Sequence, residues 1–562
     1  MFIEKIIKKI KKVNELKVFY IILILLFSLI YMAPFLFGYI YGDDTVFHLM
    51  NIDLYSNTSI FSKIIPFYVN NMGWGVGIFY PCLPHICGAL ILRIINNFGF
   101  NSILALKIVK FVITFLSGLF MYLLSLKIYK NKKISLFSSL FYVSSSYFFV
   151  DTYVRDALNE SAIFIFIPLI FLGLYYLLND FNIKKFYIYF ICGYVGMIYC
   201  HLLITMWFTF LVVIFLLFYL KKFLTIKIIK PFILSIVIVV GLTGTFIFPL
   251  LEHMIKGSWF IPAYKYVWCL PIYGYFIGDY YKTSSNGLLF IRFPSYVIVL
   301  TIIGSFNLIF RRKKYKYDRR FLSGIFVFSI ISMLLSSQSI FWDNIPKFFN
   351  NIQFAWRIVA FSTFGICLFS VSGLESVYNI FKDKYRYILT IFVICLIAVF
   401  TFNNMSLVRI NNSIDYGEYV YKSFSKYSNK DYLPNKSIEN IDYIVSLKDD
   451  DIHIEGNASV KVLKNETSYM VFKVSGIENN INIEIPRLYY LGYKVTNSNN
   501  NVISYTESSN GLIQINIKKN GVYKLKYTGT FWYKMALIYK FIIVVILILK
   551  ISSKRIFINR KD

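Results

Sequence analysis

The amino-acid sequence predicts a mainly α-helical, polytopic membrane protein with about twelve transmembrane helices and a β-rich domain before the last of them. The chain of 562 residues is 57% hydrophobic and 20% aromatic. Many windows reach the roughly 20 largely apolar residues that a helix needs to cross a bilayer. Basic residues gather between these windows, and a polar segment rich in Asn and Ser separates the last window from the others.

The net charge of +30 is concentrated in clusters between the apolar segments. The clusters are Lys5–Lys12, Lys127–Lys133, Lys184–Lys185, Lys221–Lys230, Arg311–Arg320, Lys382–Arg386 and Lys554–Lys561. Loops rich in Lys and Arg are typical of the cytoplasmic face and favour contact with anionic membrane lipid. The charge therefore reports topology, and nucleic acid is not an expected partner.

We assign the transmembrane spans so that every basic cluster lies on the cytoplasmic side. The first is Val18–Phe37, and the others are approximately 103–126, 134–150, 161–178, 186–201, 203–220, 231–250, 287–310, 320–338, 357–374, 386–402 and 532–550. The apolar segment Val76–Ile95 would invert every later loop if it crossed, and Pro81, Pro84 and Arg93 interrupt it. We therefore expect it to be a re-entrant or surface-lying helix. The prediction is a multi-pass membrane protein with both termini in the cytoplasm.

Three regions follow from this assignment. Residues 1–403 form the polytopic domain with a long first outer loop, 39–102, and 531–562 form the last span with a basic tail. Residues 404–530 lie outside and contain short alternating runs, such as Tyr469–Val474, Asn482–Ile485 and Ile513–Ile517. Turn signals separate these runs at Ser475-Gly476, Asn510-Gly511 and Asn520-Gly521. Such a pattern predicts an antiparallel β domain.

Two adjacent carboxylates, Asp43 and Asp44, come directly after the first span. A structural interpretation is that Asp43 caps a helix beginning at Thr45, whose apolar face would lie on the membrane. Asp44 and His48 are four residues apart and share a face of that helix. They could act as a base with its orienting partner, or as two ligands of a divalent cation. A carboxylate beside another one near lipid is expected to have a raised pKa, which suits a general base.

A second polar group joins two spans on the same outer face. It contains Arg155, Asp156 and Glu160, and Arg155 could clamp a phosphate while an acidic neighbour holds it in place. The alternative is an ordinary polar turn between helices. Other candidates are weaker, because their residue types are also common at membrane interfaces. These are Gln353 and Arg357 at the start of a span, His201 at the end of another, and Arg292 in an outer loop.

These residues resemble a known pattern. Gly42-Asp43-Asp44-x-x-Phe47-His48-Leu49, followed by Gly73-Trp74-Gly75-Val76-Gly77-Ile78-Phe79-Tyr80-Pro81-Cys82-Leu83-Pro84, is similar to the first outer loop of a bacterial membrane family. That family bears a name referring to 6-pyruvoyl-tetrahydropterin synthase. It is akin to the YfhO-like proteins and to the GT-C superfamily of glycosyltransferases that use polyprenyl-phosphate sugars. Later landmarks are Tyr153-x-Arg155-x-x-x-x-Glu160, Cys200-His201-Leu202, Gln353-Phe354-Ala355-Trp356-Arg357 and the segment 486–495.

The resemblance implies a GT-C-like fold and a membrane glycosyltransferase. Asp43 or Asp44 would then act as general base or help to bind a divalent cation, with His48 orienting them. Arg155, Arg292 and Arg357 would neutralise the leaving polyprenyl phosphate, supported by Asp156, Glu160, His201 and Gln353. The acceptor would be an envelope polymer or a surface protein, and no cofactor is certain. The alternatives are a catalytically silent scaffold for envelope assembly and a lipid or polysaccharide transporter, which would need ionisable residues within its spans.

Overall fold

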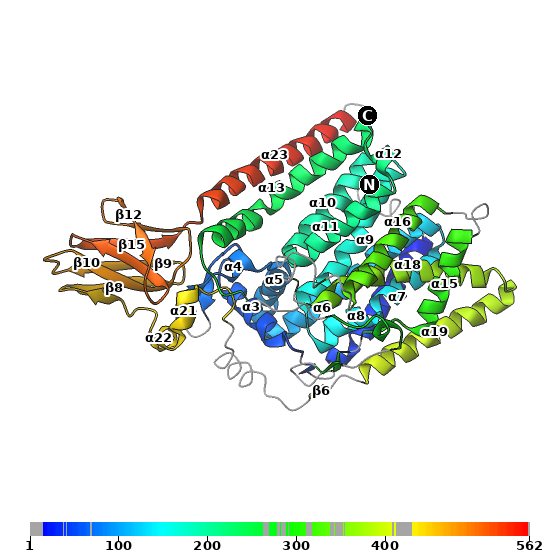
Figure 1. Ribbon diagram of the computed structural model, residues 1–562, viewed down its shortest axis with the longest axis horizontal. Coiled ribbons are helices and arrows are strands. Elements are labelled where there is room, and N and C mark those ends of the chain that lie inside the picture. The colour runs from blue at the N-terminus through cyan, green and yellow to red at the C-terminus, as the bar shows by residue number, and fades with distance from the viewer. Residues whose placement is uncertain are drawn as a thin grey trace. The chain divides into compact units, whose positions relative to one another are not determined.

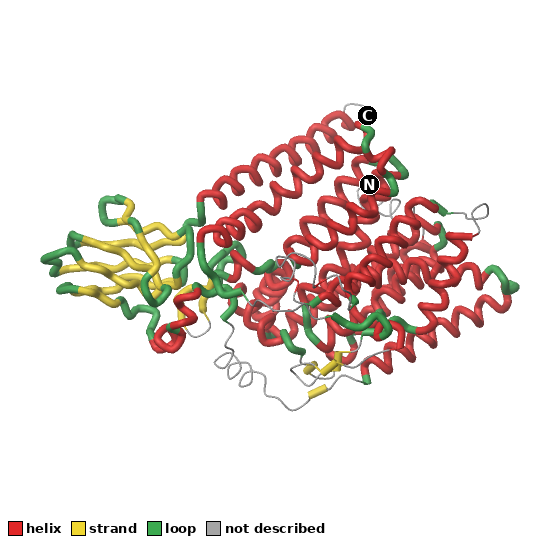
Figure 2. The backbone as a smooth tube through the Cα atoms, in the orientation of Figure 1, coloured by secondary structure: helices red, strands yellow, loops and turns green. Residues whose placement is uncertain are grey.

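The computed structural model describes residues 15–36, 39–40, 42–67, 70–261, 269–277, 281–282, 288–289, 291–310, 317–337, 342, 352, 354–406, 410–411 and 430–559. It is mostly helical, with strands gathered in the C-terminal part (Figure 1; Figure 2). The chain divides into two compact units. The first comprises Met1–Leu49, Ile94–Ile236 and Ala263–Ile414, and the second comprises Met50–Arg93, Val237–Pro262 and Asp415–Asp562.

Each predicted span contains a helix in the part that the structure describes, and within the described residues seven helices are long and apolar enough to cross a membrane. The protein is therefore membrane-embedded. The seven are α6 (Ser102–Tyr129), α9 (Leu158–Leu178), α13 (Ile226–Lys256), α16 (Arg319–Ser336), η5 with α18 (Ala355–Tyr378), α19 (Asp383–Met405) and the apolar part of α23 (Phe531–Asn559). The remaining predicted spans are α2 (Glu15–Tyr31), α7 (Lys132–Val143), α10 (Ile183–Cys200), α11 (Leu202–Leu217) and α15 (Ser295–Phe310).

The core of the first unit is built on α9 and α18. Nearly all of the apolar stretch of each helix is buried inside the protein. α9 packs against α6 and α10, and α18 packs against α7, α15 and α16. In contrast, α19 buries little of its surface. A long apolar helix with so much uncovered surface is suited to contact with lipid.

Two predicted spans differ from the observed helices for local reasons. The segment 134–150 divides into α7 and α8 (Ser146–Phe149). The hydroxyls of Ser144 and Ser145 donate hydrogen bonds of 2.7 Å to the carbonyls of Leu140 and Tyr142, which compete with the helical ladder. The span expected from residue 287 becomes helical only at Ser295, directly after Pro294, because proline is favoured at the start of a helix and not inside it.

The first outer loop also differs from the expectation. Helix α3 (Thr45–Asn57) begins where predicted, but Val46, Phe47, Leu49 and Met50 are buried in the protein. The expected apolar face on the membrane surface is therefore wrong. The segment Val76–Ile95 forms two helices, α4 (Val76–Phe79) and α5 (Leu83–Ile95), separated at Pro81. It contains no single helix of spanning length.

The β-rich part of the second unit contains two antiparallel sheets. One has the strand order β13-β14-β10-β7 and the other β12-β11-β15-β9-β8. The strands are β7 (His453–Glu455), β8 (Ser459–Glu466), β9 (Tyr469–Ser475), β10 (Ile481–Leu488), β11 (Tyr493–Thr496), β12 (Val502–Ile503), β13 (Tyr505–Glu507), β14 (Leu512–Ile517) and β15 (Gly521–Tyr527). The three predicted runs are β9, β10 and β14. Two short helices that we did not predict, α21 (Asn435–Glu439) and α22 (Ile441–Ser446), precede the strands.

Candidate functional site

The predicted acidic loop packs directly on the second polar segment, within the first unit. The backbone N–H of Asp44 donates a hydrogen bond of 2.9 Å to the carbonyl of Arg155. The approach is so close that a Cβ atom at Gly42 would lie 2.7 Å from the carbonyl carbon of Arg155 and from the backbone nitrogen of Asp156. Only glycine fits at this position without moving one of the two segments.

Asp156 joins this loop to a transmembrane helix. Its Oδ2 accepts a hydrogen bond of 2.5 Å from the Thr45 hydroxyl, which in turn accepts one of 2.8 Å from the N–H of Gly42. Its Oδ1 forms an ion pair of 2.7 Å with Nζ of Lys110 on α6, and both side chains are almost fully buried. Burial raises the pKa of Asp156, and Lys110 and Thr45 oppose that rise. The backbone of Asp156 is left-handed, with φ of 57°.

Glu160, at the start of α9, is the centre of a second buried network. Arg155 donates to both of its oxygens at 2.9 Å, and Nε of Arg357 donates to Oε1 at 2.9 Å. Arg155 also donates to Asp151 at 3.0 Å, and the hydroxyl of Tyr147 donates to Glu160 at 3.1 Å. Burial, followed by the charge of Glu160, raises the pKa of Asp151 well above its ordinary value. The network fixes both guanidinium groups against one carboxylate.

Asp44 differs from these buried carboxylates. Its side chain is only partly buried, whereas Asp151, Asp156 and Glu160 are almost fully buried. Desolvation raises the pKa of Asp44 to about 7, with Arg155 opposing and Glu160, Asp156 and Asp43 adding to the rise. Asp43 is also partly exposed. A partly exposed carboxyl group with a pKa near neutrality has the ionisation that a general base needs.

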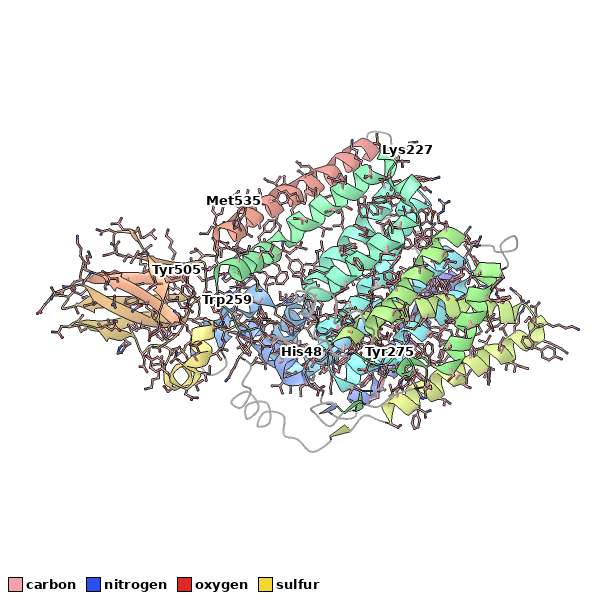
Figure 3. All side chains as sticks on the ribbon, viewed as in Figure 1. His48, Lys227, Trp259, Tyr275, Tyr505 and Met535 are labelled. Carbon is pink, nitrogen blue, oxygen red and sulfur yellow. The ribbon has the colours of Figure 1, made fainter. Side chains whose placement is uncertain are left out.

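His48 accepts a backbone hydrogen bond in this structure and is not placed as a base. It is buried on α3 (Figure 3), and its Nε2 accepts a hydrogen bond of 3.2 Å from the backbone N–H of Leu158, the first residue of α9. Burial, followed by the charge of Lys110, lowers the pKa of His48 to about 3. The ring is therefore neutral, and this nitrogen satisfies a helix terminus instead of serving as a base.

The other predicted residues are distributed around this centre. Nδ1 of His201 accepts a hydrogen bond of 3.4 Å from the N–H of Ile204 and so caps α11, and Glu160 interacts with this imidazole electrostatically. Arg292 lies beside Ser146, whose hydroxyl accepts a hydrogen bond of 3.2 Å from its N–H, and over the ring of Phe400. Gln353 lies outside the described residues.

Sequence reasoning missed Lys110, Thr45 and Tyr147. A signal existed for Lys110, since a lysine two turns into an apolar span needs a partner, and Asp156 is the partner that the fold supplies. Neither Thr45 nor Tyr147 carried a signal, because their importance depends on contacts with residues 111 and 13 positions away.

The three buried acidic side chains, Asp151, Asp156 and Glu160, contact three cations, Lys110, Arg155 and Arg357. Asp43 and Asp44 add two partly exposed acidic groups beside them. Across the part of the chain that the structure describes, no group of three or more His, Cys, Asp or Glu side chains is placed to hold a metal ion.

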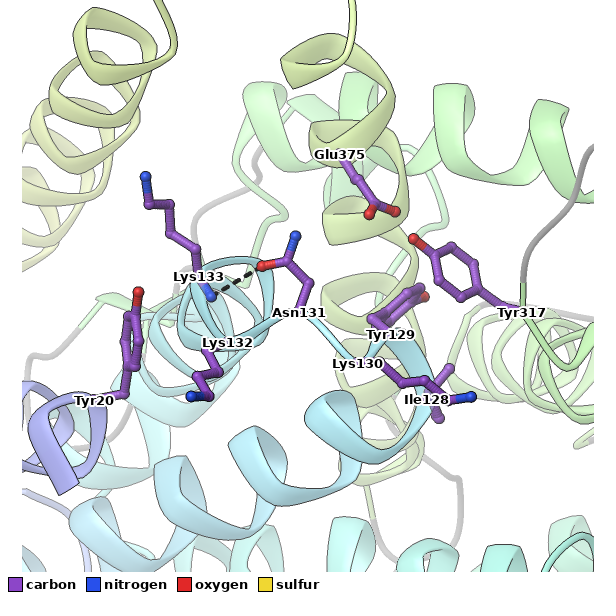
Figure 4. A pocket seen from close by; sticks show the side chains of 9 residues that line it. All are labelled: Tyr20, Ile128, Tyr129, Lys130, Asn131, Lys132, Lys133, Tyr317 and Glu375. Carbon is purple, nitrogen blue, oxygen red and sulfur yellow. Dashed lines mark hydrogen bonds between the residues drawn. The ribbon is translucent and has the colours of Figure 1, made fainter. Parts of the chain in front are cut away.

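Two recesses among the described residues are lined by other side chains. One, of about 590 Å³, is formed at the turn between α6 and α7 (Figure 4). Its lining is Tyr20, Ile128, Tyr129, Lys130, Asn131, Lys132, Lys133, Tyr317 and Glu375. The other, of about 320 Å³, is in the second unit and includes Glu252, Lys256 and Lys534. Neither lining includes a predicted site residue.

Two comparisons with known proteins found no match. No protein-family model matches the chain, and no curated protein matches it either.

Proposed function

We propose that this protein is an integral-membrane glycosyltransferase of the GT-C type, which moves a sugar from a polyprenyl-phosphate donor to an extracytoplasmic acceptor of a bacterial envelope. The observation that carries the proposal is the environment of Asp44. Its side chain is partly exposed, desolvation raises its pKa to about 7, and its backbone N–H is hydrogen-bonded to the carbonyl of Arg155. Such an arrangement favours a positioned base over a surface charge.

In the proposed reaction, Asp44 takes the proton from an acceptor hydroxyl as its oxygen attacks the anomeric carbon of the donor sugar. The bond between that carbon and the phosphate oxygen breaks, and the lipid phosphate leaves with the electron pair. Attack opposite the leaving group inverts the anomeric centre. Asp43 is the neighbouring acid that adds to the desolvation-raised pKa of Asp44 or orients the acceptor.

Arg155 is the proposed partner of the leaving phosphate. A guanidinium has five N–H groups, and Arg155 uses three of them on Asp151 and Glu160. The two that remain can meet phosphate oxygens, while Glu160 holds the group still. Arg357 shares Glu160 with Arg155 and would add positive charge at the same place. Preorganised cations of this kind stabilise charge that develops in the transition state.

The proposed setting is a multi-pass protein with about twelve spans, cytoplasmic termini and this site on the outer side. Its support is the agreement of the basic clusters with one inside-outside assignment. A donor carried on polyprenyl phosphate reaches such a site through the bilayer. A divalent cation could join Asp43 and Asp44 when substrate supplies further oxygen ligands.

Transfer from a panel of radiolabelled polyprenyl-phosphate sugars tests the proposal. Membranes containing the wild type would be compared with Asp43→Asn/Asp44→Asn and with Glu478→Gln, which changes one exposed carboxylate in the β-rich part. We expect label in a polymer or protein fraction for the wild type and the Glu478 variant alone. Absence of donor consumption by folded, inserted wild type across the panel would contradict the proposal.

One observation favours a second candidate, a lipid or polysaccharide transporter. Lys110 lies within an apolar span and is ion-paired with buried Asp156, and ionisable residues inside the membrane often mark transport or proton pathways. Flux of a labelled lipid-linked sugar across proteoliposomes, without transfer of the sugar, would support transport. A scaffold would show neither flux nor transfer, and its phenotype would survive the Asp43→Asn/Asp44→Asn substitution.

A further inference from the structure

One sheet of the second unit exposes a dense group of lysines on its outer face. Its strands place the side chains alternately inward and outward, and the inward residues, such as Met470, Phe472 and Leu525, are fully buried. The exposed lysines are Lys461 and Lys464 on β8, Lys473 on β9, Lys494 on β11, and Lys524 and Lys526 on β15. We call these six residues the lysine face.

The strand register brings the lysines next to one another. Lys494 lies directly opposite Lys526, and Lys461 lies directly opposite Lys473. Lys524 is two residues from Lys526 on the same strand and is a diagonal neighbour of Lys473. Five lysines therefore form one continuous stripe across β11, β15, β9 and β8. From strand spacings the stripe is roughly 20 Å from end to end.

Such an arrangement works against the stability of the sheet. Like charges directly opposite one another in an antiparallel pair are destabilising, and this face has two such pairs. Among the described residues, compensation on this face is limited to Glu466, which forms an ion pair of 2.7 Å with Lys464, outside the stripe.

Protection of sheet edges does not explain the stripe. Lysine on an edge strand prevents pairing with other chains, and this accounts for Lys461 and Lys464 on β8. Lys473, Lys494, Lys524 and Lys526 lie on β9, β11 and β15, which are interior strands of the order β12-β11-β15-β9-β8.

General abundance of lysine does not explain it either. The four strands of the other sheet, β7, β10, β13 and β14, contain no lysine at all. Their outward positions include Glu455, Asn482 and Asn516, which meet in register. The two sheets of the same domain therefore differ in surface chemistry, and the exposed lysines are confined to the strands of one sheet.

We propose that the lysine face binds a linear polyanion, a polymer with a phosphate or carboxylate group in each repeat unit. A continuous positive stripe about as long as several repeat units suits an extended charged chain. A membrane surface is less suited as the partner, because Val471, Val522 and Thr496 stand between the lysines where an inserting face carries large apolar side chains. The proposal does not depend on the transferase activity.

The test uses the full chain in neutral nanodiscs, with binding measured by surface interferometry. The probes are sodium polyphosphate, polygalacturonate, neutral dextran and vesicles containing phosphatidylglycerol. The stripe variant is Lys473→Gln/Lys494→Gln/Lys524→Gln/Lys526→Gln. The matched control is Lys436→Gln/Lys448→Gln/Lys518→Gln/Lys519→Gln, which removes the same charge from exposed positions of the same unit outside these strands.

We expect the wild type to bind one or both acidic polymers, but not dextran, with an affinity that falls steeply as salt is added. The stripe variant should lose at least tenfold in affinity, and the control variant should stay within twofold. The Tm of the stripe variant should be no lower than that of the wild type, because repulsion is removed. Equal loss in both variants, or absence of polymer binding by the wild type, would overturn the proposal. Stripe-dependent binding to the vesicles alone would replace the polymer with a membrane surface.

Discussion

The backbone N–H of Asp44 donates a hydrogen bond of 2.9 Å to the carbonyl of Arg155. The contact links the proposed base to the residue proposed to meet the leaving phosphate, without using either side chain. The guanidinium of Arg155 is itself fixed by Glu160. The separation between Asp44 and the Arg155 guanidinium is therefore set by a backbone hydrogen bond and a buried ion pair. Such preorganisation lowers the barrier of a catalysed reaction.

The pH dependence of sugar transfer should report the ionisation of Asp44. Its carboxylate must be ionised to accept a proton, and its pKa is about 7. We expect kcat/KM to fall about tenfold per pH unit below pH 7 and to level off above it. The measurement is initial transfer rate between pH 5 and 9 at constant ionic strength. A flat profile over this range would remove Asp44 from the role of base.

Replacing Asp44 with Asn should stabilise the protein at high pH. The raised pKa means that the folded state holds the Asp44 proton that the unfolded state loses above about pH 4. The stability that this proton provides is present at low pH and is lost as pH rises through about 7. Because the side chain is partly hydrated, we expect a gain of about 1–2 kcal/mol for Asp44→Asn at pH 8.

The check is thermal unfolding in detergent at pH 5 and pH 8. The difference in Tm between Asp44→Asn and wild type should be larger at pH 8, and the exposed control Glu478→Gln should show no such change. A difference that shrinks as pH rises would contradict the raised pKa of Asp44.

Glu160→Gln should be among the most destabilising single substitutions in the first unit. Glu160 is the shared acceptor of Arg155 and Arg357, so its neutralisation leaves two buried cations with insufficient negative charge. Breaking a buried ion pair from one side costs about 3–5 kcal/mol. Tyr147→Phe removes one neutral donor to the same carboxylate and should cost only about 1 kcal/mol. Tm values of the two variants, measured together, decide the point, and equal losses would show that the charge of Glu160 is not what matters.

Lys110 and Asp156 should show strong energetic coupling. Lys110→Met leaves Asp156 buried without its cation, and we expect a loss of about 3 kcal/mol. Adding Asp156→Asn removes the uncompensated charge while keeping an acceptor for Thr45, so the double variant should regain part of that loss. Additive effects in a double-mutant cycle would mean that the ion pair contributes nothing to stability.

Gly42→Ala should disturb the site through packing alone. The new methyl group would meet backbone atoms of Arg155 and Asp156 at 2.7 Å, and backbone cannot move aside as a flexible side chain can. We expect a loss of about 1–3 kcal/mol and a fall in transfer of at least tenfold. Gly244→Ala is the control, because its Cβ would find its nearest neighbour, a side-chain atom of Phe248, at 3.2 Å. Normal transfer by Gly42→Ala would show that the loop can shift without consequence.

Much of the fold could be predicted from local patterns. Long apolar runs gave the helices, since a helix satisfies its own backbone hydrogen bonds wherever it lies. The start of α3 at Thr45 and the strands β9, β10 and β14 were also predicted, because alternation and turn residues act over a few positions. Two predictions were wrong because they depend on hydrogen bonds and packing that composition does not show. Ser144 and Ser145 break a predicted span, and the apolar side chains of α3 are buried in protein instead of meeting lipid.

The sequence by itself determined that this chain is mainly helical and membrane-embedded and that it carries a β-rich C-terminal region, and it predicted Asp43, Asp44, Arg155 and Glu160 as site residues. Only the tertiary structure decided how they are used. It placed Asp44 on the backbone of Arg155, gave Glu160 two guanidinium partners and turned His48 into a helix cap. The physical reason is that periodicity depends on neighbours within a few residues, whereas burial and pairing depend on segments that are distant in the chain.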